Sequence, residues 1–211
     1  SLNKKIGVIG GGQLGKMLFE AGSPLNIDYT FIEKSAGCPA SLVCANQIVG
    51  GLKDADAIEK LAERCDVLTY EIEHINVEKL LELEAKAVEI IPSPKVLQVI
   101  QDKGLQKEFY TNNDLSTLPY HICSSEELAT AVNKWPDITF VLKHRKGGYD
   151  GKGVQVLTKD RFAALLQNND SSLLSEDGYV IEKFLGKVTE VSVIVAVGEN
   201  EIAAYEPCEM I

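Results

Sequence analysis

A glycine-rich run between two apolar segments is the first candidate for phosphate chemistry. Residues 147–153 place Tyr149, Asp150 and Lys152 among glycines, with apolar segments at 140–143 and 155–157 on either side. Backbone amides that no side chain shields can donate hydrogen bonds to phosphate oxygens. The run lacks Gly-Lys-Ser/Thr and no helix is expected directly after it, so it is not a P-loop. It predicts a hairpin whose tip folds over a polyphosphate, with an ordinary long hairpin turn as the alternative.

Charged residues at the ends of apolar segments could complete a nucleotide site. Lys143 ends an apolar run, and burial of its neighbours directs it toward a cleft where it can reach phosphate oxygens. Lys103 is a second candidate cation. Residues 182–185 can offer a carboxylate and a backbone carbonyl to an adenine amino group, with Leu185 covering the ring, and Glu190 can accept ribose hydroxyls. The alternatives are solvated surface lysines and an exposed charged turn.

A second glycine-rich turn lies near the start of the chain. Residues 10–15 have the spacing Gly-x-Gly-x-x-Gly after a predicted strand and before a predicted helix, and Glu33 ends the next predicted strand. Glycines and a helix N-terminus together favour an anion, and an acid at the end of the second strand is typical of ribose binding. A dinucleotide-binding module is therefore one interpretation, and tight packing of a strand on a helix is the purely structural one.

Strand-like and helix-like segments alternate before residue 94. Strands are expected at 6–9, 29–32, 47–49, 67–70 and 88–91, and helices at 55–64, at 77–83 and after the glycine turn, where Leu14, Met17 and Leu18 share one face. Such alternation predicts a doubly wound parallel sheet. Pro92 and Pro94 stop the last strand, so we expect a first domain over residues 1–94.

The pattern after residue 94 mixes strands and helices without alternation. A helical connector is expected at 95–110, a capping box at 124–127, a helix capped by Asp160, and an antiparallel pair from 190–197 and 202–205. We expect a second domain over 95–211, with a central lid part at about 124–185 and the start of a further part at 186–211.

Composition excludes several classes of protein. The chain has 211 residues, 45% of them hydrophobic, with a formal net charge of −10. This balance argues against nucleic-acid and anionic-membrane partners, because phosphate backbones need clustered cations. No apolar stretch reaches the roughly 18 residues of a membrane span, and no signal peptide is recognised. Five cysteines without a Cys-x-x-Cys pair indicate reduced thiols and no zinc site. We therefore expect a cytoplasmic protein.

Together these residues resemble the ATP-grasp superfamily, and within it the family of N5-carboxyaminoimidazole ribonucleotide synthetases. The resemblance rests on Gly-Gly-Gly-Gln-Leu-Gly-Lys-Met at 10–17, Thr-Tyr-Glu-Ile-Glu at 69–73, Gln-Asp-Lys at 101–103 and Gly-Gly-Tyr-Asp-Gly-Lys-Gly at 147–153. It implies an α/β fold in which a Rossmann-like pre-ATP-grasp domain precedes an incomplete α+β ATP-grasp domain.

The resemblance also implies an activity: ATP- and bicarbonate-dependent carboxylation of 5-aminoimidazole ribonucleotide through carboxyphosphate, in purine biosynthesis. The substrate would then contact Gly12, Gln13, Leu14, Glu71 and Glu73. ATP would contact Lys103, Lys143, Gly148, Gly151, Gly153, Glu182, Lys183, Phe184, Leu185 and Glu190. Catalysis would involve Tyr149, Asp150 and Lys152, with Asp150 orienting or deprotonating the substrate amine. Glu33 would have no dinucleotide role.

The resemblance carries further expectations. The family commonly has Arg where Lys103 stands, so the charge is kept but bidentate geometry is lost. Mg²⁺ would accompany ATP, with its ligands beyond residue 211, and the full-length enzyme would be a homodimer. This chain would be its front part and inactive alone. The alternatives are a formate-dependent glycinamide ribonucleotide transformylase, a dinucleotide-binding module and a catalytically inactive binding module.

Overall fold

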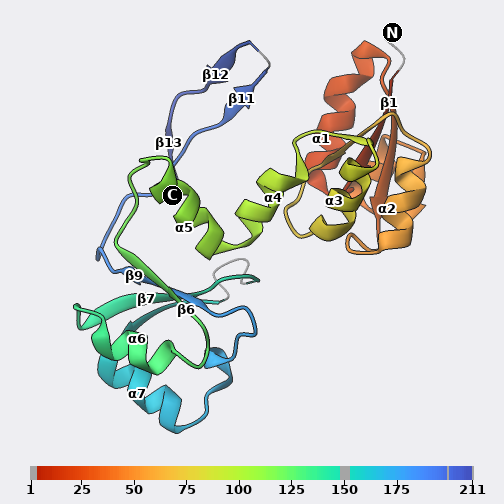
Figure 1. Cartoon of the computed structure of the whole chain (residues 1–211). Coiled ribbons are helices and arrows are strands. Elements are labelled where there is room, and N and C mark those ends of the chain that lie inside the picture. Colours follow the sequence, from red (N-terminus) through yellow and green to blue (C-terminus); the bar gives the residue numbers. More distant parts are fainter. Residues whose placement is uncertain (1–3, 148–152, 199, 211) are drawn as a thin grey trace.

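Two sheets of different kinds are joined by a bent pair of helices (Figure 1). The computed structural model describes residues 4–147, 153–198 and 200–210. The pair consists of α4 (Pro94–Gln101) and α5 (Lys103–Asn112), which run between the two sheet-containing units. Since α4 begins at Pro94, it starts where we place the domain boundary, which stays a prediction. Within the described ranges, no helix is both long and apolar enough to cross a membrane.

The first unit is the predicted parallel sheet, with strand order β3-β2-β1-β4-β5. Its strands are β1 (Lys5–Ile9), β2 (Asp28–Glu33), β3 (Gln47–Val49), β4 (Val67–Tyr70) and β5 (Glu89–Ile90). Its helices are α1 (Gln13–Gly22), α2 (Ala55–Ala62) and α3 (Val77–Ala85), with short helices η1 (Ser23–Leu25) and η2 (Pro39–Leu42). Alternate side chains of β1 enter separate cores: Val8 packs with Phe19 of α1, and Ile9 packs with Leu61 and Leu80. Helices therefore cover both faces, as a doubly wound sheet requires.

Helix α1 does not bury the apolar face that the sequence suggests. Leu14 and Met17 are 59% and 53% exposed, and the helix instead buries Gly15, Phe19 and Gly22. A Cβ on Gly15 would lie 3.0 Å from the carbonyl oxygen of Gly10, so glycine lets the helix approach the turn that precedes it. Close backbone approach, rather than leucine packing, sets the orientation of this helix.

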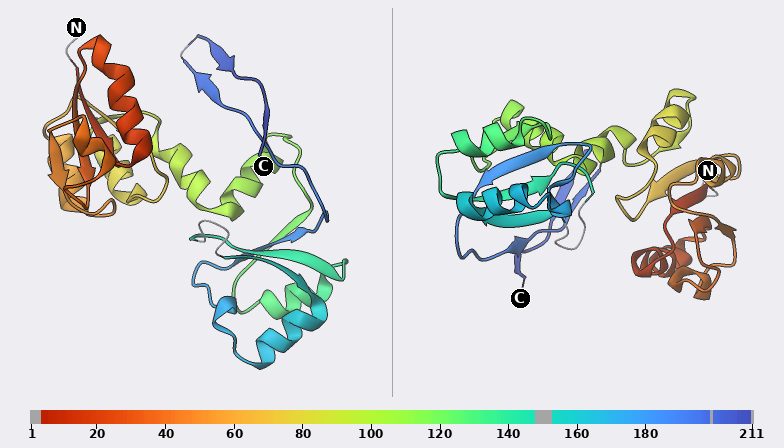
Figure 2. Two further views of the ribbon diagram at one scale, coloured as in Figure 1. Left: turned by 180° about the vertical axis from the view of Figure 1, so that it is seen from behind. Right: turned by 90° about the horizontal axis from the view of Figure 1, so that it is seen from below.

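The second unit is a four-stranded antiparallel sheet of order β6-β9-β7-β8 (Figure 2). Its strands are β6 (Tyr120–Cys123), β7 (Thr139–His144), β8 (Val154–Thr158) and β9 (Tyr179–Lys183), and its helices are α6 (Leu128–Lys134), α7 (Lys159–Gln167) and η3 (Ser171–Leu173). Phe140, Leu142 and Ile181 form one core with residues of α6 and α7. Because strand residues alternate between faces, Lys143 and Glu182 lie on the opposite face.

The helix caps of this unit are partly as expected. The capping box is confirmed, since the Ser124 amide donates to Glu127 Oε2 and the Glu127 amide donates to Ser124 Oγ. The cap of α7 is Thr158 instead of Asp160, because Thr158 Oγ1 accepts from the Arg161 amide. Asp160 lies within the first turn of the helix, where its negative charge favours the helix dipole.

The helical connector expected at 95–110 consists of two helices, because the chain bends at Asp102. This residue has an extended backbone (φ −118°, ψ 108°), and its side chain accepts from the Gly104 and Leu105 amides. Asp102 therefore ends α4 and caps α5. A helix-length apolar pattern continues through the bend, so periodicity alone could not locate it.

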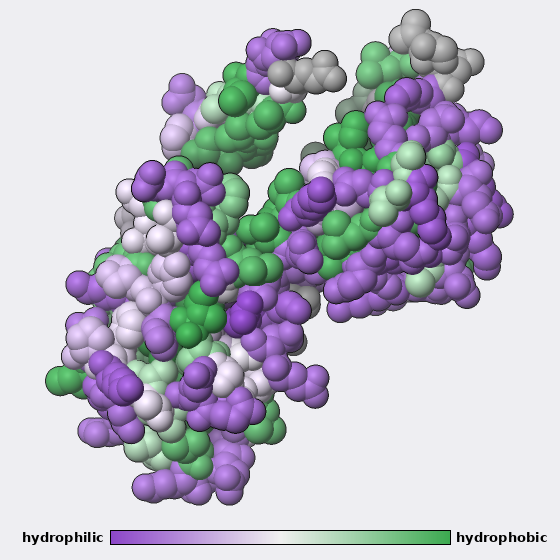
Figure 3. Space-filling model, viewed as in Figure 1, coloured by the Kyte–Doolittle hydropathy of each residue, from purple (hydrophilic) through white to green (hydrophobic). Residues whose placement is uncertain are grey.

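An exposed arm follows β9. It contains β10 (Val191–Ser192), β11 (Val195–Val197), β12 (Ile202–Ala204) and β13 (Cys208–Glu209), in which β11 pairs with β12 and β10 with β13. The predicted antiparallel pair is confirmed, although its first strand is interrupted after Ser192. Hydrophobic side chains lie along the arm (Figure 3), and Val197 and Ile202 are 74% and 73% exposed.

Candidate functional site

Lysines from two elements converge on one buried carboxylate on the open face of the second sheet. Lys143 Nζ of β7 lies 2.7 Å from Glu182 Oε2, and Lys107 Nζ of α5 lies 2.9 Å from Glu182 Oε1. Glu182 is only 3% exposed. Burial raises its pKa, but the hydrogen bonds and charges of the two lysines outweigh burial, so the pKa lies below its ordinary value. The carboxylate is therefore ionised and fixes both ammonium groups.

Lys103 lies close to this cluster and forms no ion pair with any carboxylate among the described residues. Its Nζ donates to the Gly147 carbonyl oxygen at 3.2 Å. Burial lowers its pKa, as does the nearby charge of Lys143, although Asp102 partly opposes them. Lys103 and Lys143, the two cations predicted to hold phosphates, are thus neighbours in space. An anion bound between them would relieve their mutual repulsion.

The base of the β7–β8 hairpin carries excess positive charge. Among the residues that the structure describes there, Lys103, Lys107 and Lys143 surround the single carboxylate of Glu182, while Arg145 pairs with Asp102 and Lys146 with Asp177. This excess arises in a chain whose formal net charge is −10. Local placement of cations therefore gives this region a local charge that favours an anion, opposite in sign to the net charge of the chain.

The sequence interpretation missed Lys107 and Arg145. Lys107 follows Lys103 by four residues, and residues at this spacing share a helix face, so the helical pattern could have indicated it. Lys107 also donates to Thr117 Oγ1 at 2.7 Å. Arg145 forms a two-point contact with Asp102, and no sequence signal joins residues so far apart.

The proposed lid is described only at its two ends. Gly147 and Gly153 have positive φ angles of 69° and 77°, and the His144 amide donates to the Gly153 carbonyl oxygen at 2.8 Å. The predicted hairpin of β7 and β8 is confirmed. The sites expected at Gly148, Tyr149, Asp150, Gly151 and Lys152 lie outside the described residues, and their roles stay predictions.

The linker expected to hold adenine and ribose leaves the sheet and is open to solvent. Lys183, Phe184, Leu185 and Glu190 are all exposed. The Lys183 amide donates to the Pro119 carbonyl oxygen, which fixes the start of the linker beside the connection to β6. The structure thus places Glu182 with the lysines, while Leu185 and Glu190 lie on the exposed linker.

The first glycine turn is lined by acids. The Gly12 amide donates to Glu71 Oε1 at 3.0 Å, and the Gly11 amide donates to Glu33 Oε2 at 3.3 Å. Gly10 has φ +115°, and a Cβ there would lie 2.6 Å from the Glu71 side chain. The turn therefore requires glycine, and it presents carboxylates where a dinucleotide would place its pyrophosphate.

The expected substrate residues are partly gathered at this turn. Gly12 and Glu71 are in contact, and the exposed residues Gln13 and Leu14 begin α1 directly after them. Glu73 lies further along, where its Oε1 is 3.1 Å from His74 Nε2. The carbonyl oxygens of Glu73 and Ile75 both accept from Gln101 Nε2.

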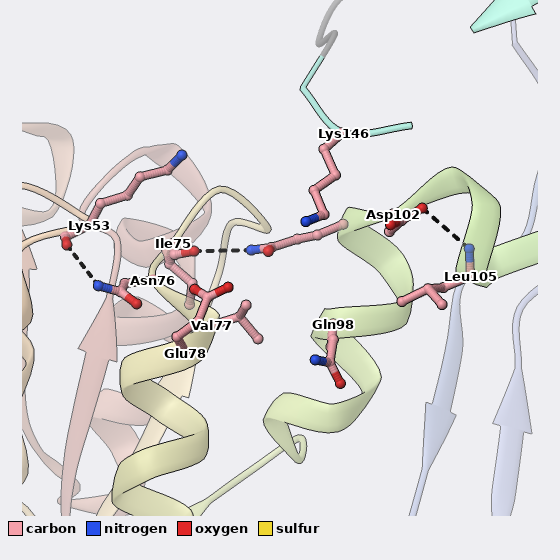
Figure 4. Close-up of a pocket in the computed structure, with 10 residues that line it drawn as sticks. Lys53, Ile75, Asn76, Val77, Glu78, Gln98, Asp102, Leu105 and Lys146 are labelled. Carbon is pink, nitrogen blue, oxygen red and sulfur yellow. Dashed lines mark hydrogen bonds between the residues drawn. The ribbon is translucent and has the colours of Figure 1, made fainter. Parts of the chain in front are cut away.

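A cavity of about 360 Å³ separates the two units beside these contacts (Figure 4). Lys53 and Asn76 line it from the first unit, Gln101 and Asp102 from the bend, and Lys146 from the hairpin base. Over the described ranges, no three His, Cys, Asp or Glu side chains gather as a metal site.

Two family models match the chain. The ribonucleotide synthetase preATP-grasp domain matches residues 3–101, and the ATP-grasp domain matches residues 108–211. An N5-carboxyaminoimidazole ribonucleotide synthase of Brucella melitensis is 35% identical over 192 residues, which are 90% of this chain and 52% of that protein.

Solved structures agree with this match. The N5-carboxyaminoimidazole ribonucleotide synthetase of Thermotoga maritima aligns with a TM-score of 0.82 at 35% identity, over 98% of this chain and 54% of that one. The Aspergillus clavatus synthase in complex with ADP and 5-aminoimidazole ribonucleotide aligns with a TM-score of 0.83 at 29% identity, over 99% and 54%. The chain thus spans about half the length of these relatives. It belongs to the ATP-grasp superfamily and, within it, to the family of N5-carboxyaminoimidazole ribonucleotide synthetases.

Proposed function

We propose that the protein carrying this chain uses ATP and bicarbonate to carboxylate 5-aminoimidazole ribonucleotide. The observation that supports this most is the juxtaposition of Lys103 and Lys143 at the base of a glycine-rich hairpin. Two neighbouring cations beneath backbone amides suit a triphosphate. The Aspergillus relative, solved with ADP and 5-aminoimidazole ribonucleotide, supplies the ligand chemistry.

The reaction would proceed in two steps. A bicarbonate oxygen attacks the γ-phosphorus of ATP, the bond to the β-phosphate oxygen breaks, and ADP and carboxyphosphate form. The substrate amine then attacks the carboxyphosphate carbon, phosphate leaves, and the amine loses a proton. Lys103 and Lys143 stabilise charge on the phosphoryl oxygens during the first step. Asp150 would orient or deprotonate the amine in the second.

The first glycine turn would hold the ribonucleotide. Glu71 and the turn at Gly12, with Gln13 and Leu14 next to them, offer carboxylate and backbone groups to an amine and to hydroxyls. Glu33 and Glu71 would repel a pyrophosphate placed on the same amides, which argues against a dinucleotide. For the same reason the 5′-phosphate of the ribonucleotide would lie away from these two carboxylates. Glu73 would contribute from the adjoining segment.

The remaining parts of the proposal concern the nucleotide, the partners and the location. Lys183, Phe184 and Leu185 would hold adenine beside Glu182, Glu190 would bind ribose, and Gly148, Gly151, Gly153 and Lys152 would close over the phosphates with Tyr149. Mg²⁺ would be bound by residues other than those described. A homodimer and a cytoplasmic location complete the proposal.

The test is ADP formation by the purified protein with bicarbonate and aminoimidazole ribonucleotide each present or omitted. We expect ADP formation to require both, and Lys143→Met to lower kcat/KM for ATP by roughly 10- to 100-fold through the loss of a charged hydrogen bond. Lys4→Met is the matched control, since Lys4 pairs with Glu89 in the first unit. ADP formation that is indifferent to both substrates would refute the proposal.

A further inference from the structure

Three consecutive residues at the helix bend each contact a different part of the candidate site. They are Gln101 at the end of α4, Asp102 between the helices, and Lys103 at the start of α5. A continuous helix would direct them around one axis, about 100° apart. Because the backbone at Asp102 is extended, the three side chains point in different directions and contact different parts of the molecule.

Gln101 contacts the substrate side. Its Nε2 donates to the carbonyl oxygen of Glu73 at 2.6 Å and to that of Ile75 at 3.0 Å. These carbonyls follow Glu71, whose carboxylate accepts from the first glycine turn. One amide group thus fixes the segment that leads from Glu71 to the cavity between the units.

Asp102 contacts the lid side through Arg145. Asp102 Oδ1 accepts from Arg145 Nε at 3.0 Å, and Oδ2 accepts from Nη2 at 2.8 Å. Asp102 is 4% exposed. Burial raises its pKa, but Arg145 and the amides of Leu105 and Gly104 outweigh burial and keep the carboxyl ionised. Such a two-point pair fixes direction as well as distance.

Lys103 is held at both ends by the same stretch of chain. Its amide donates to the Arg145 carbonyl oxygen at 2.9 Å, and its Nζ donates to the Gly147 carbonyl oxygen at 3.2 Å. Gly104 permits this approach, since a Cβ there would lie 2.7 Å from Arg145 Nε. A flexible lysine therefore has a defined position against the base of the hairpin.

We propose that Asp102 and Arg145 are positioning residues that hold Lys103 against the base of the lid, while Gln101 fixes the substrate segment to the same bend. The identity of the ligands rests on the proposed function, but the positioning itself does not. The bend then sets the distance between the nucleotide half and the substrate half of the site.

The main test compares ATP affinity, measured by isothermal titration calorimetry, in Arg145→Met, Arg145→Lys and Asp102→Asn. We expect Arg145→Met to weaken ATP about tenfold, a loss typical of one charge-assisted contact, and Arg145→Lys to restore it only partly. In a protein that already carries Lys103→Met, the same substitutions should cause little further loss of ATP affinity, because they act through Lys103. Losses that add fully in that background would overturn the proposal.

The variant Gln101→Leu tests whether the substrate half of the site is fixed separately from the nucleotide half. We expect it to raise KM for aminoimidazole ribonucleotide several-fold while leaving ATP affinity near that of the wild type. Glu89→Gln is the control, because it removes the negative charge of the exposed Lys4–Glu89 pair, which belongs to the first unit and not to the bend. Equal effects of Gln101→Leu on both ligands would contradict separate fixation.

Hydrogen–deuterium exchange tests positioning without any ligand. In Arg145→Met we expect faster exchange in peptides covering residues 103–105 and 144–147, with the wild-type rate in both peptides for Glu89→Gln. Wild-type rates in Arg145→Met would show that the pair holds nothing in place. If the wild-type protein binds no ATP, the proposed function fails, and this exchange experiment still decides the positioning.

Discussion

The turn between β1 and α1 and the hairpin between β7 and β8 both place glycines at strand ends, yet the side chains around them carry opposite charge. At the first turn, backbone amides donate to Glu33 and Glu71. At the base of the second, Lys103 donates to a backbone carbonyl and Lys143 lies close by. One surrounding suits amines and hydroxyls, and the other suits phosphates.

Sheet architecture explains the difference. In the parallel sheet, β1 lies between β2 and β4, so the residues that follow these neighbouring strands gather at the carboxyl end of β1. Glu33 is the last residue of β2, and Glu71 directly follows β4. In the antiparallel sheet, one face packs on helices and the other presents alternate residues, Lys143 and Glu182 among them. Glycine spacing thus indicates the backbone shape of a turn. The charged side chains on neighbouring strand ends and sheet faces determine which kind of ligand suits that turn.

The largest expected effect comes from removing the carboxylate that balances the cations. Glu182→Gln leaves Lys107 and Lys143 without a counter-charge, and breaking a buried pair in this way costs about 3 kcal/mol. Urea unfolding followed by circular dichroism measures the loss. Glu71→Gln at the first turn should cost about 1 kcal/mol, because an amide oxygen still accepts from Gly12.

The exposed Glu89–Lys4 pair provides the control for this difference. Glu89→Gln should cost less than about 1 kcal/mol, as is usual for surface pairs. Equal losses for Glu182→Gln and Glu71→Gln would show that the two turns do not differ in their dependence on charge.

A smaller contrast concerns the glycines themselves. Gly10→Ala combines φ +115° with a Cβ that would lie 2.6 Å from Glu71, and we expect a loss of about 2 kcal/mol in unfolding free energy. Gly147→Ala meets only the backbone penalty at φ +69°, since no atom of the described residues lies within 4 Å of the added Cβ, and should cost about 1 kcal/mol. Thermal unfolding of both variants measures the difference; a larger loss for Gly147→Ala would contradict it.

The smallest effect is a change with pH. The folded pKa of Glu182 is lowered by its lysines despite burial, so its contribution to stability is fully present above its unfolded pKa, about 4.3. That contribution is lost as the pH falls through the folded pKa. The stability gap between wild type and Glu182→Gln should therefore narrow on acidification, in urea midpoints measured from pH 7 to pH 3. A gap that widens would contradict this sign.

Sequence could predict the features that depend on local pattern. The parallel sheet, the hairpin, the capping box at Ser124 and the pairing of β11 with β12 all follow from periodicity and turn residues. Lys103 and Lys143 were also singled out as candidate cations, and the structure brings them near each other, while their role in phosphate binding stays a prediction. Motif similarity then supplied the family, which the comparisons confirm.

Features that depend on contacts distant in sequence could not be predicted. The bend at Asp102 is stabilised by Arg145, which is 43 residues further along. Helix α1 turns its leucines outward because glycines approach the preceding turn. Lys107 has its role only because β9 brings Glu182 beneath α5. Each depends on a tertiary neighbour that no local pattern specifies.

The bend at Asp102 also affects how this region can change in evolution. One inserted residue in α4 would rotate the end of the helix by about 100°, which would move Gln101 away from the carbonyl oxygens of Glu73 and Ile75. Substitutions at the half-exposed residues Val96 and Ile100 leave that rotation unchanged. Here the number of residues between the two units is under stricter constraint than the identity of most of them.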